Sequence, residues 1–297
     1  MKGTVLIAGG TGLIGQELQA LLIKNNFTVR VLTRRASNES KNLFHWNPIK
    51  KEIDEKALHN VTHIINLAGE SVAGKRWTKT RKAAIISSRT VPAAFLYQLR
   101  DKMPLLQQYL TASGINAYGY NKELDITENE SRGTDFLSEV VKKWEETADA
   151  FEAVVPVCKL RIGVVFAKAG GALQQLVLPI KWFVGSPIGN GKQNIPWIDS
   201  ADLCQIFLHA IQQNLSGAYN CSANNISNEE LTKTIATLLK RPLFLPKVPA
   251  FVMRILLGEM ADIVLKGLHP SNEKLLQSGF KFQFDLSASL NKNLVQK

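Results

Sequence analysis

The chain has 297 residues, of which 45% are hydrophobic and 21% charged, a composition that excludes a disordered protein. Its net charge of +11 is compatible with nucleic acid, an anionic membrane or a polyanionic small ligand as a partner. Three widely spaced cysteines argue against a disulfide framework, the histidine spacing predicts no metal site, and no apolar run is long enough to span a bilayer. We therefore expect a cytoplasmic protein without a metal.

The first 33 residues predict a strand, a glycine-rich turn, a helix and a second strand. Residues 4–8 are a short run of β-forming apolar residues, which is typical of a buried parallel strand. Leucines then recur at helical spacing until Asn25, and residues 28–33 form the next β-type run. A β-α-β unit of this length is the usual beginning of a nucleotide-binding sheet.

Strands and helices continue to alternate along the first half of the chain. This alternation predicts a parallel, doubly wound α/β sheet with right-handed crossovers. The expected strands are 61–69, 108–113 and 154–166, and the expected helices are 79–100 and 135–150.

The second half of the chain has more glycine and proline, and its predicted elements are shorter. Ser227 and Glu230 form a capping box that predicts a helix ending near Lys240. We expect a Rossmann-like domain at 1–166, with sheet contributions from 197–223, and a smaller C-terminal α/β cap at 167–297 that shapes the substrate site. The other elements expected here are a Gly- and Pro-punctuated stretch at 170–197, a helix at 201–213, a strand at 217–222 and short helices within 246–279.

The turn after the first strand carries Gly9, Gly12 and Gly15 in a GxxGxxG frame. Glycine permits the tight turn, lets a pyrophosphate approach the main chain and allows the helix to pack closely. The helix N-terminus then offers amide donors to a phosphate. The strand–turn–helix context favours dinucleotide binding, and the alternative is a tight turn without a ligand.

The end of the second strand favours NADP(H) over NAD(H). An NAD site usually has an Asp or Glu there, but this chain has Thr33, Arg34 and Arg35. Guanidinium groups pair with a 2′-phosphate through charge-assisted hydrogen bonds. The alternative is that these arginines are solvated surface charges.

Motifs along nearly the whole chain resemble one protein family. The chain is similar to the extended short-chain dehydrogenases/reductases, and within them to the atypical branch of NAD(P)-dependent nucleotide-sugar epimerase-like proteins with a C-terminal domain of unknown function. The motifs that carry this resemblance are GGTGLIG (9–15), NLAGE (66–70), SSR (87–89), GSPIGNGKQNIPWIDSADL (185–203), GAYNCSA (217–223), RPLFLPKVPAF (241–251) and GFKF (279–282).

The resemblance implies roles for particular residues along the chain. Ser113 falls where the superfamily has a Ser or Thr at a strand end, and Asp199 stands where the family usually has His. The implied cofactor residues are Gly9, Thr11, Gly12, Leu13 and Ile14 at the pyrophosphate, Thr33 and Arg34 at the 2′-phosphate, Leu67, Ala68 and Gly69 beside adenine and ribose, Arg89 near the cofactor, and Val164 where the chain passes the nicotinamide.

The catalytic Tyr-x-x-x-Lys pair of the superfamily is missing from the expected helix. Leu137 and Val141 occupy its two positions, and neither side chain transfers protons. The spacing does occur at Tyr118 and Lys122, but we expect a loop there, where a four-residue spacing aligns nothing. Ser113 and Tyr118 are therefore the candidate catalytic residues.

The tryptophans and cysteines have simpler interpretations. Trp144 and Trp182 are expected to pack against other residues, whereas Trp197, beside a proline in an expected loop, is a candidate for the cleft. Cys158 lies among apolar residues of a strand and is expected to be a buried thiol.

Three functions remain open from the sequence. The first is an NADP(H)-dependent oxidoreductase or epimerase that acts on a hydroxyl or carbonyl group of a small molecule, such as a nucleotide sugar. The second is a non-catalytic NADP(H)-binding sensor or scaffold. Nucleic-acid binding rests only on the net charge, without a recognition motif. We expect neither nucleic acid nor a membrane as a partner, and the oligomeric state stays open.

Overall fold

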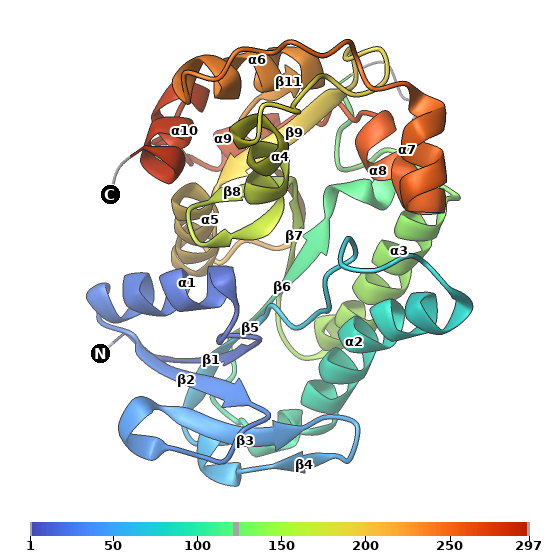
Figure 1. Ribbon diagram of the computed structural model, residues 1–297. Helices are drawn as coiled ribbons and strands as arrows, with labels where there is room; N and C mark the ends of the chain where they lie inside the picture. The colour runs from blue at the N-terminus through green and yellow to red at the C-terminus, as the bar shows by residue number, and fades with distance from the viewer. Residues whose placement is uncertain (1, 121–124, 296–297) are drawn as a thin grey trace.

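The computed structural model describes residues 2–120 and 125–295, which form a central sheet, helices on both of its faces and a C-terminal region (Figure 1). The sheet has eight strands in the order β10-β7-β6-β5-β1-β2-β3-β4. All neighbours are parallel except β3 and β4, so the predicted doubly wound parallel α/β sheet is confirmed. The strands are β1 (Thr4–Ala8), β2 (Thr28–Thr33), β3 (Leu43–Asn47), β4 (Glu52–Ile53), β5 (Val61–Asn66), β6 (Gln108–Gly114), β7 (Val157–Ile162) and β10 (Gly217–Cys221).

Helices cover the two faces of this sheet. On one face α1 (Leu13–Lys24) packs beside α5 (Ser200–Gln212), and on the other α2 (Lys79–Gln98) packs beside α3 (Phe136–Asp149) (Figure 1). The central strand β1 shows why both faces need a cover. Val5 and Ile7 belong to the core below α1 and α5, whereas Leu6 and Ala8 belong to the core below α2. A strand buried on both sides has an uninterrupted apolar sequence.

The predicted strand at 154–166 is wrong as one element, because it divides at Gly163 between two sheets. β7 ends at Ile162 in the large sheet, and β8 (Val164–Ala167) begins a smaller sheet of the order β11-β9-β8. A Cβ at Gly163 would lie 2.5 Å from the carbonyl oxygen of Pro196, so the crossing needs glycine. The other strands of the small sheet are β9 (Asn194–Asp199) and β11 (Asn225–Ser227), and its helices are α4 (Gly171–Lys181), α6 (Asn228–Leu238) and α10 (Leu286–Leu294).

Asp199 ties the last helix to the small sheet. Its fully buried carboxylate caps α5 and accepts hydrogen bonds from Ser289 Oγ at 2.6 Å, Lys292 Nζ at 2.6 Å and Asn293 Nδ2 at 2.9 Å, all three on α10. The residue at the position of the family's usual histidine therefore anchors the C-terminal helix. The remaining short helices are α7 (Ala250–Leu257), α8 (Asp262–Leu265) and α9 (Glu273–Gln277).

Two of the expectations for tryptophan are wrong. Trp197 lies within β9, where it is buried and stacks on Phe166 with ring centroids 5.2 Å apart. Trp182 follows α4 and is 72% exposed. Trp144 and Cys158 are buried, as expected. Among the described residues, no helix has both the length and the apolar character needed to cross a membrane.

Candidate functional site

The glycine turn lies where the sheet reverses its order of strand addition. β2 is added on one side of β1 and β5 on the other, so a crevice is expected outside the carboxyl ends of β1 and β5. Gly9 has φ +77°, and a Cβ there would lie 2.7 Å from the carbonyl carbon of Leu67. Leu67 N donates to Ala8 O at 2.8 Å. The glycine turn and the segment after β5 are therefore in direct backbone contact. We call the carboxyl ends of β1, β2 and β5, together with these two segments, the β1 edge.

The N-terminus of α1 begins at this edge. Gly12 is its N-cap and provides no side chain to satisfy the first amides of the helix, and the first turn has no acidic residue. A Cβ at Gly15 would lie 2.5 Å from Gly10 Cα, so the helix packs directly on the turn. Thr11 is exposed on the turn, and Leu13 lies near Gly171 at the start of α4. This arrangement of free amide donors can bind an anionic phosphate group.

Two arginines follow β2 at the same edge. Thr33 is buried, and its Oγ1 accepts a hydrogen bond from Arg35 N at 3.2 Å. Arg34 and Arg35 are exposed, and neither guanidinium has a hydrogen bond or ion pair within residues 2–120 and 125–295. They are cations available to a ligand at the sheet edge.

Arg89 supports the segment that follows β5. Its Nη2 donates to Glu70 O at 2.9 Å and its Nη1 to Ile85 O at 3.0 Å, while its guanidinium lies 5.0 Å from the ring centroid of Trp144. Burial lowers the pKa of Arg89 to about 10. Gly69 fits closely above it, because a Cβ there would be 3.1 Å from Arg89 Cζ. The guanidinium thus stabilises the segment after β5, which contains the residues predicted to lie beside adenine and ribose.

The helix predicted to lack a proton-transfer pair is α3, and its face toward β6 is apolar where the pair would lie. Leu137 and Val141 are buried one turn apart. Gly114 at the end of β6 lies opposite Val141, since a Cβ there would be 3.1 Å from Val141 Cγ2. The two positions of the pair therefore carry no proton donor or acceptor, and the nearby hydroxyl of Ser138 donates to Asn116 O at 2.8 Å.

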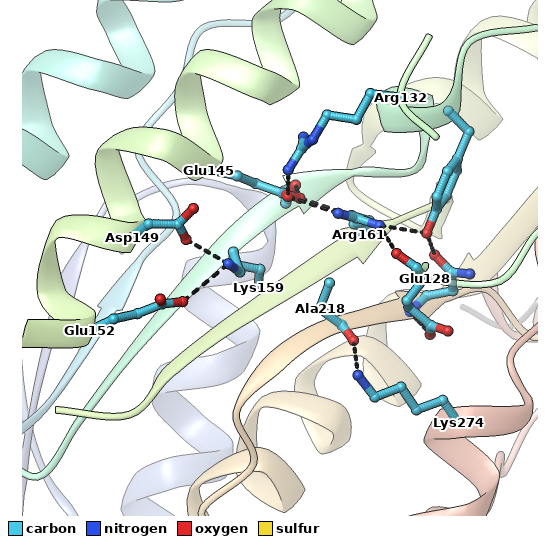
Figure 2. A network of polar contacts seen from close by, with 12 residues as sticks. Glu128, Arg132, Glu145, Asp149, Glu152, Lys159, Arg161, Ala218 and Lys274 are labelled. Carbon is cyan, nitrogen blue, oxygen red and sulfur yellow. Dashed lines mark hydrogen bonds and ion pairs between the residues drawn. The ribbon is translucent and has the colours of Figure 1, made fainter. Parts of the chain in front are cut away.

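One turn further along α3, a carboxylate is fully buried. Figure 2 shows Glu145 in contact with Arg132 and Arg161, and Ser113 Oγ donates to Glu145 Oε1 at 2.5 Å. Arg161 binds both carboxylate oxygens, from Nε and Nη2 at 2.9 Å each, and Arg132 Nη2 approaches Oε2 at 2.6 Å. Burial alone would raise its pKa, but the bonds to Arg161 and Ser113 and the charges of the two arginines lower the pKa of Glu145 to about 2. Glu145 is therefore an ion at neutral pH.

Tyr118 joins the same group of polar side chains. It ends a short 3₁₀ turn at 115–118, Gly119 follows at φ +69°, and Lys122 lies outside the described residues. Its hydroxyl donates to Asn220 Oδ1 at 2.6 Å and accepts from Arg161 Nη1 at 2.7 Å. Burial raises the pKa of Tyr118 to about 12. Ser113 and Tyr118 are thus brought together through Glu145 and Arg161, in what we call the β6-edge network.

Sequence reasoning missed the residues that connect this network. Arg161 is a charge within an apolar strand, and such a charge requires a buried partner, so this pattern could have indicated it. Asn220 on β10 gave no such indication, although its Nδ2 donates to Ile126 O at 3.0 Å and Ser271 O at 2.9 Å and its N to Glu128 Oε1 at 2.7 Å. The network joins β6, β7, β10 and α3 at one edge of the sheet.

Val164 and the other predicted cofactor residues also reach the carboxyl-terminal side of the sheet. Val164 begins β8, directly after the crossing glycine, and pairs with Trp197 of β9. The predicted binding residues therefore come from β1, α1, β2, the segment after β5, α2 and β8, and the structure places most of them along the β1 edge.

Comparisons with known proteins agree with this geometry. Residues 5–139 match the NAD dependent epimerase/dehydratase family and residues 248–287 a domain of unknown function, DUF1731. The epimerase family protein YfhF of Bacillus subtilis is 33% identical over 99% of this chain and 98% of its own length. A crystal structure of the human epimerase family protein SDR39U1 with NADPH is 28% identical, covers 98% of both chains and has a TM-score of 0.86. The UDP-glucose 4-epimerase of Thermus thermophilus, solved with NAD, shares the fold at 17% identity and a TM-score of 0.78 over 98% of this chain and 97% of its own.

Proposed function

The chain belongs to the NAD dependent epimerase/dehydratase family, and on that premise we propose that it binds NADP(H) at the β1 edge. The observation that carries the proposal is the glycine turn against Leu67, with uncapped amides at α1 and, after β2, an Arg34 guanidinium that has no partner in the described part of the chain. The amides suit a pyrophosphate, and the guanidinium suits a 2′-phosphate. The relative SDR39U1, 28% identical, was solved with NADPH.

The reaction that we propose is hydride exchange with a small molecule bearing a hydroxyl or carbonyl group, and a nucleotide sugar is the first class to test. NADP(H), when bound, supplies or accepts the hydride. Ser113 is the hydroxyl proposed to polarise the substrate oxygen, which requires it to exchange Glu145 for the substrate. Arg132 and Arg161 would keep the Glu145 carboxylate compensated during this exchange, because both already bind it.

Tyr118 is the second hydroxyl proposed for the site. With a pKa of about 12 it keeps its proton at neutral pH, so it is a poor general base, and it must release Asn220 Oδ1 before it can donate that proton to a substrate. Its bonds to Arg161 and Asn220 fix the phenol in one orientation. Tyr118 thus suits substrate orientation better than proton abstraction.

A second candidate function is non-catalytic binding of NADP(H), as a sensor or scaffold. The observation that favours it is the apolar face of α3, where Leu137 and Val141 are buried beside Gly114. A protein that only binds the cofactor has no need of a proton-transfer pair.

Titration of nicotinamide fluorescence tests the shared part of both proposals. We expect NADPH to bind more tightly than NADH, and absence of NADPH binding would contradict both. Oxidation of NADPH across a panel of carbonyl compounds and nucleotide sugars then separates them. For the enzyme, Ser113→Ala is expected to lower turnover by roughly 100-fold at an unchanged Kd for NADPH. Full turnover in Ser113→Ala would exclude the proposed role of this hydroxyl, and no turnover with any substrate favours the binding protein.

A further inference from the structure

Large apolar side chains are exposed on the surface of the C-terminal region. Two segments are joined by backbone hydrogen bonds, from Val248 N to Pro187 O at 2.9 Å and from Gly189 N to Val248 O at 2.8 Å. On these segments Trp182 is 72% and Phe244 73% exposed. We define the apolar face as Leu178, Trp182, Phe183, Val184, Phe244 and Leu245.

The apolar face is held by a stiff piece of chain. Pro242, Pro246 and Pro249 fix their φ angles within one short segment, which reduces the freedom of its backbone. Ser186 Oγ donates to Pro246 O at 2.7 Å and fastens this segment to the one after α4. The exposed side chains therefore stand on a backbone whose freedom is reduced.

Helix α7 comes next in the chain after Leu245 and also exposes apolar side chains. None of its eight residues is buried, and Phe251 and Ile255 are exposed one turn apart. Arg76 fastens the end of the helix by donating to Leu256 O at 3.0 Å. A helix with this many apolar residues and no buried one is typical of a surface that contacts an apolar partner.

Basic side chains outnumber acidic ones around the apolar face. Residues 171–192 and 231–258 contain seven Lys and Arg and no Asp or Glu. Arg241 lies on the face itself, with its guanidinium 4.7 Å from the ring centroid of Phe183. The acidic residues nearby are Glu229, bound by Lys233 and Lys247, Asp262, bound by Arg254 and Lys266, Glu259, bound by Lys82, and the exposed Glu230. Lys181, Lys192, Lys240 and Arg241 form no ion pair among the described residues. An occupant must therefore combine an apolar interior with an anionic surface, and a second copy of this chain would bring like charges together.

We propose that the apolar face and α7 dock on the surface of an anionic phospholipid bilayer. Aromatic side chains settle at the boundary of headgroups and acyl chains, and basic side chains around them contact lipid phosphates. Trp182 and Phe244 enter this boundary, while Arg241 and Lys240 remain at the headgroups. This contact needs no spanning helix, and it replaces the expectation that no membrane is a partner. It also gives a role to the segment 231–297, where ten Lys and Arg face four Asp and Glu.

Sedimentation of the full chain with vesicles tests the proposal. Vesicles of phosphatidylcholine and phosphatidylglycerol in equal parts are expected to carry the protein into the pellet, and vesicles of phosphatidylcholine alone to leave most of it in solution. The double variant Trp182→Ala, Phe244→Ala should lose about tenfold or more in vesicle binding, because both side chains are large and apolar. Arg241→Glu should weaken binding less, and more clearly at low salt.

Matched control variants are available on the turn between β3 and β4. Ile49 is 84% exposed, and Lys50 is exposed beside it, so Ile49→Ala removes an exposed apolar side chain and Lys50→Glu reverses an exposed positive charge elsewhere on the surface. We expect both to bind vesicles as the wild type does. Equal loss in these controls, or equal binding to neutral and anionic vesicles, would overturn the proposal. The proposal would also be overturned if light scattering showed a dimer of the wild type and a monomer of the double variant, because a second copy of the chain would then cover the apolar face.

Discussion

The β1 edge is built from backbone, whereas the β6 edge, on the same side of the same sheet, is filled by charged side chains. At the β1 edge Gly9 and Leu67 meet through their main chains, and Arg34 has no partner among the described residues. At the β6 edge the carboxylate of Glu145 is enclosed by two arginines and a hydroxyl. The β1 edge has polar groups free to bind a ligand, whereas most polar groups of the β6 edge already bind one another, with Arg132 Nη1 as an exception among the described residues.

In the function proposed above, this difference separates cofactor binding at one edge from chemistry at the other. Amides and cations left without protein partners bind a ligand with little rearrangement. Hydroxyls already bound to a buried ion must first leave it, which costs free energy. The β1 edge can thus bind its ligand without giving up existing contacts. The β6-edge network stabilises the fold, and its hydroxyls must change hydrogen-bond partners before they can contact a substrate.

The largest expected effect comes from breaking the β6-edge network. Glu145→Ala leaves Arg161 buried without its carboxylate, and loss of one partner of a buried ion pair costs about 3–5 kcal/mol in unfolding free energy. Glu146→Ala is the matched control, since Glu146 is exposed and 3.9 Å from Lys142, and should change stability by no more than about 0.5 kcal/mol. Urea unfolding measures both. Similar losses in the two variants would show that the network is not a stabilising core.

Acid should remove the contribution of the Glu145 carboxylate to the free energy of unfolding. The pKa of Glu145, about 2 in the folded chain, lies below its ordinary value of 4.5. Its stabilisation is therefore complete above about pH 5 and is lost as the pH falls toward 2. The gap in unfolding free energy between the wild type and Glu145→Gln should narrow by about 3 kcal/mol over this range. A gap that stays constant with pH would mean that Glu145 is not held as an ion.

Alanine substitutions at two glycines of the turn should separate effects on the free energy of unfolding from effects on cofactor affinity at the β1 edge. Gly15→Ala places a Cβ 2.5 Å from Gly10 Cα, and such overpacking costs about 1–3 kcal/mol in stability. At Gly12 the nearest atom to a new Cβ is Gly9 O at 3.3 Å, so Gly12→Ala should cost less than about 1 kcal/mol. The same Cβ faces the expected pyrophosphate, so the Kd for NADPH should rise about tenfold. Wild-type affinity in Gly12→Ala would remove the pyrophosphate from this turn.

The fold could be predicted where the sequence pattern is local. The strands β1, β2, β5 and β6 and the helices between them follow from apolar runs and helical spacing. The small sheet could not be predicted, because 26 residues separate β8 from β9 and Gly163 looks like an interior strand residue until Pro196 lies against it. Trp197 was misplaced for the same reason, since the pairing that buries it is not local.

The candidate site divides in the same way. The glycine turn and the pair Thr33–Arg34 are contiguous, so their chemistry is visible in the sequence. The absence of Tyr and Lys from α3 was also predicted, because the family resemblance gives the two positions and a four-residue spacing places both on one helix face. The β6-edge network joins Ser113 to Glu145 across 32 positions and Tyr118 to Asn220 across 102, and only the packed sheet brings them together.

The affinity of Arg34→Ala for NADPH and NADH tests the central claim, that the β1 edge is an NADP(H) site, most directly. Loss of one charge-assisted contact to the 2′-phosphate should raise the Kd for NADPH about tenfold and leave that for NADH nearly unchanged. Arg35→Ala, a change of the same kind at the next residue, shows how much of the effect is general surface charge. An equal rise for both cofactors in Arg34→Ala would contradict the assignment of the 2′-phosphate to this arginine.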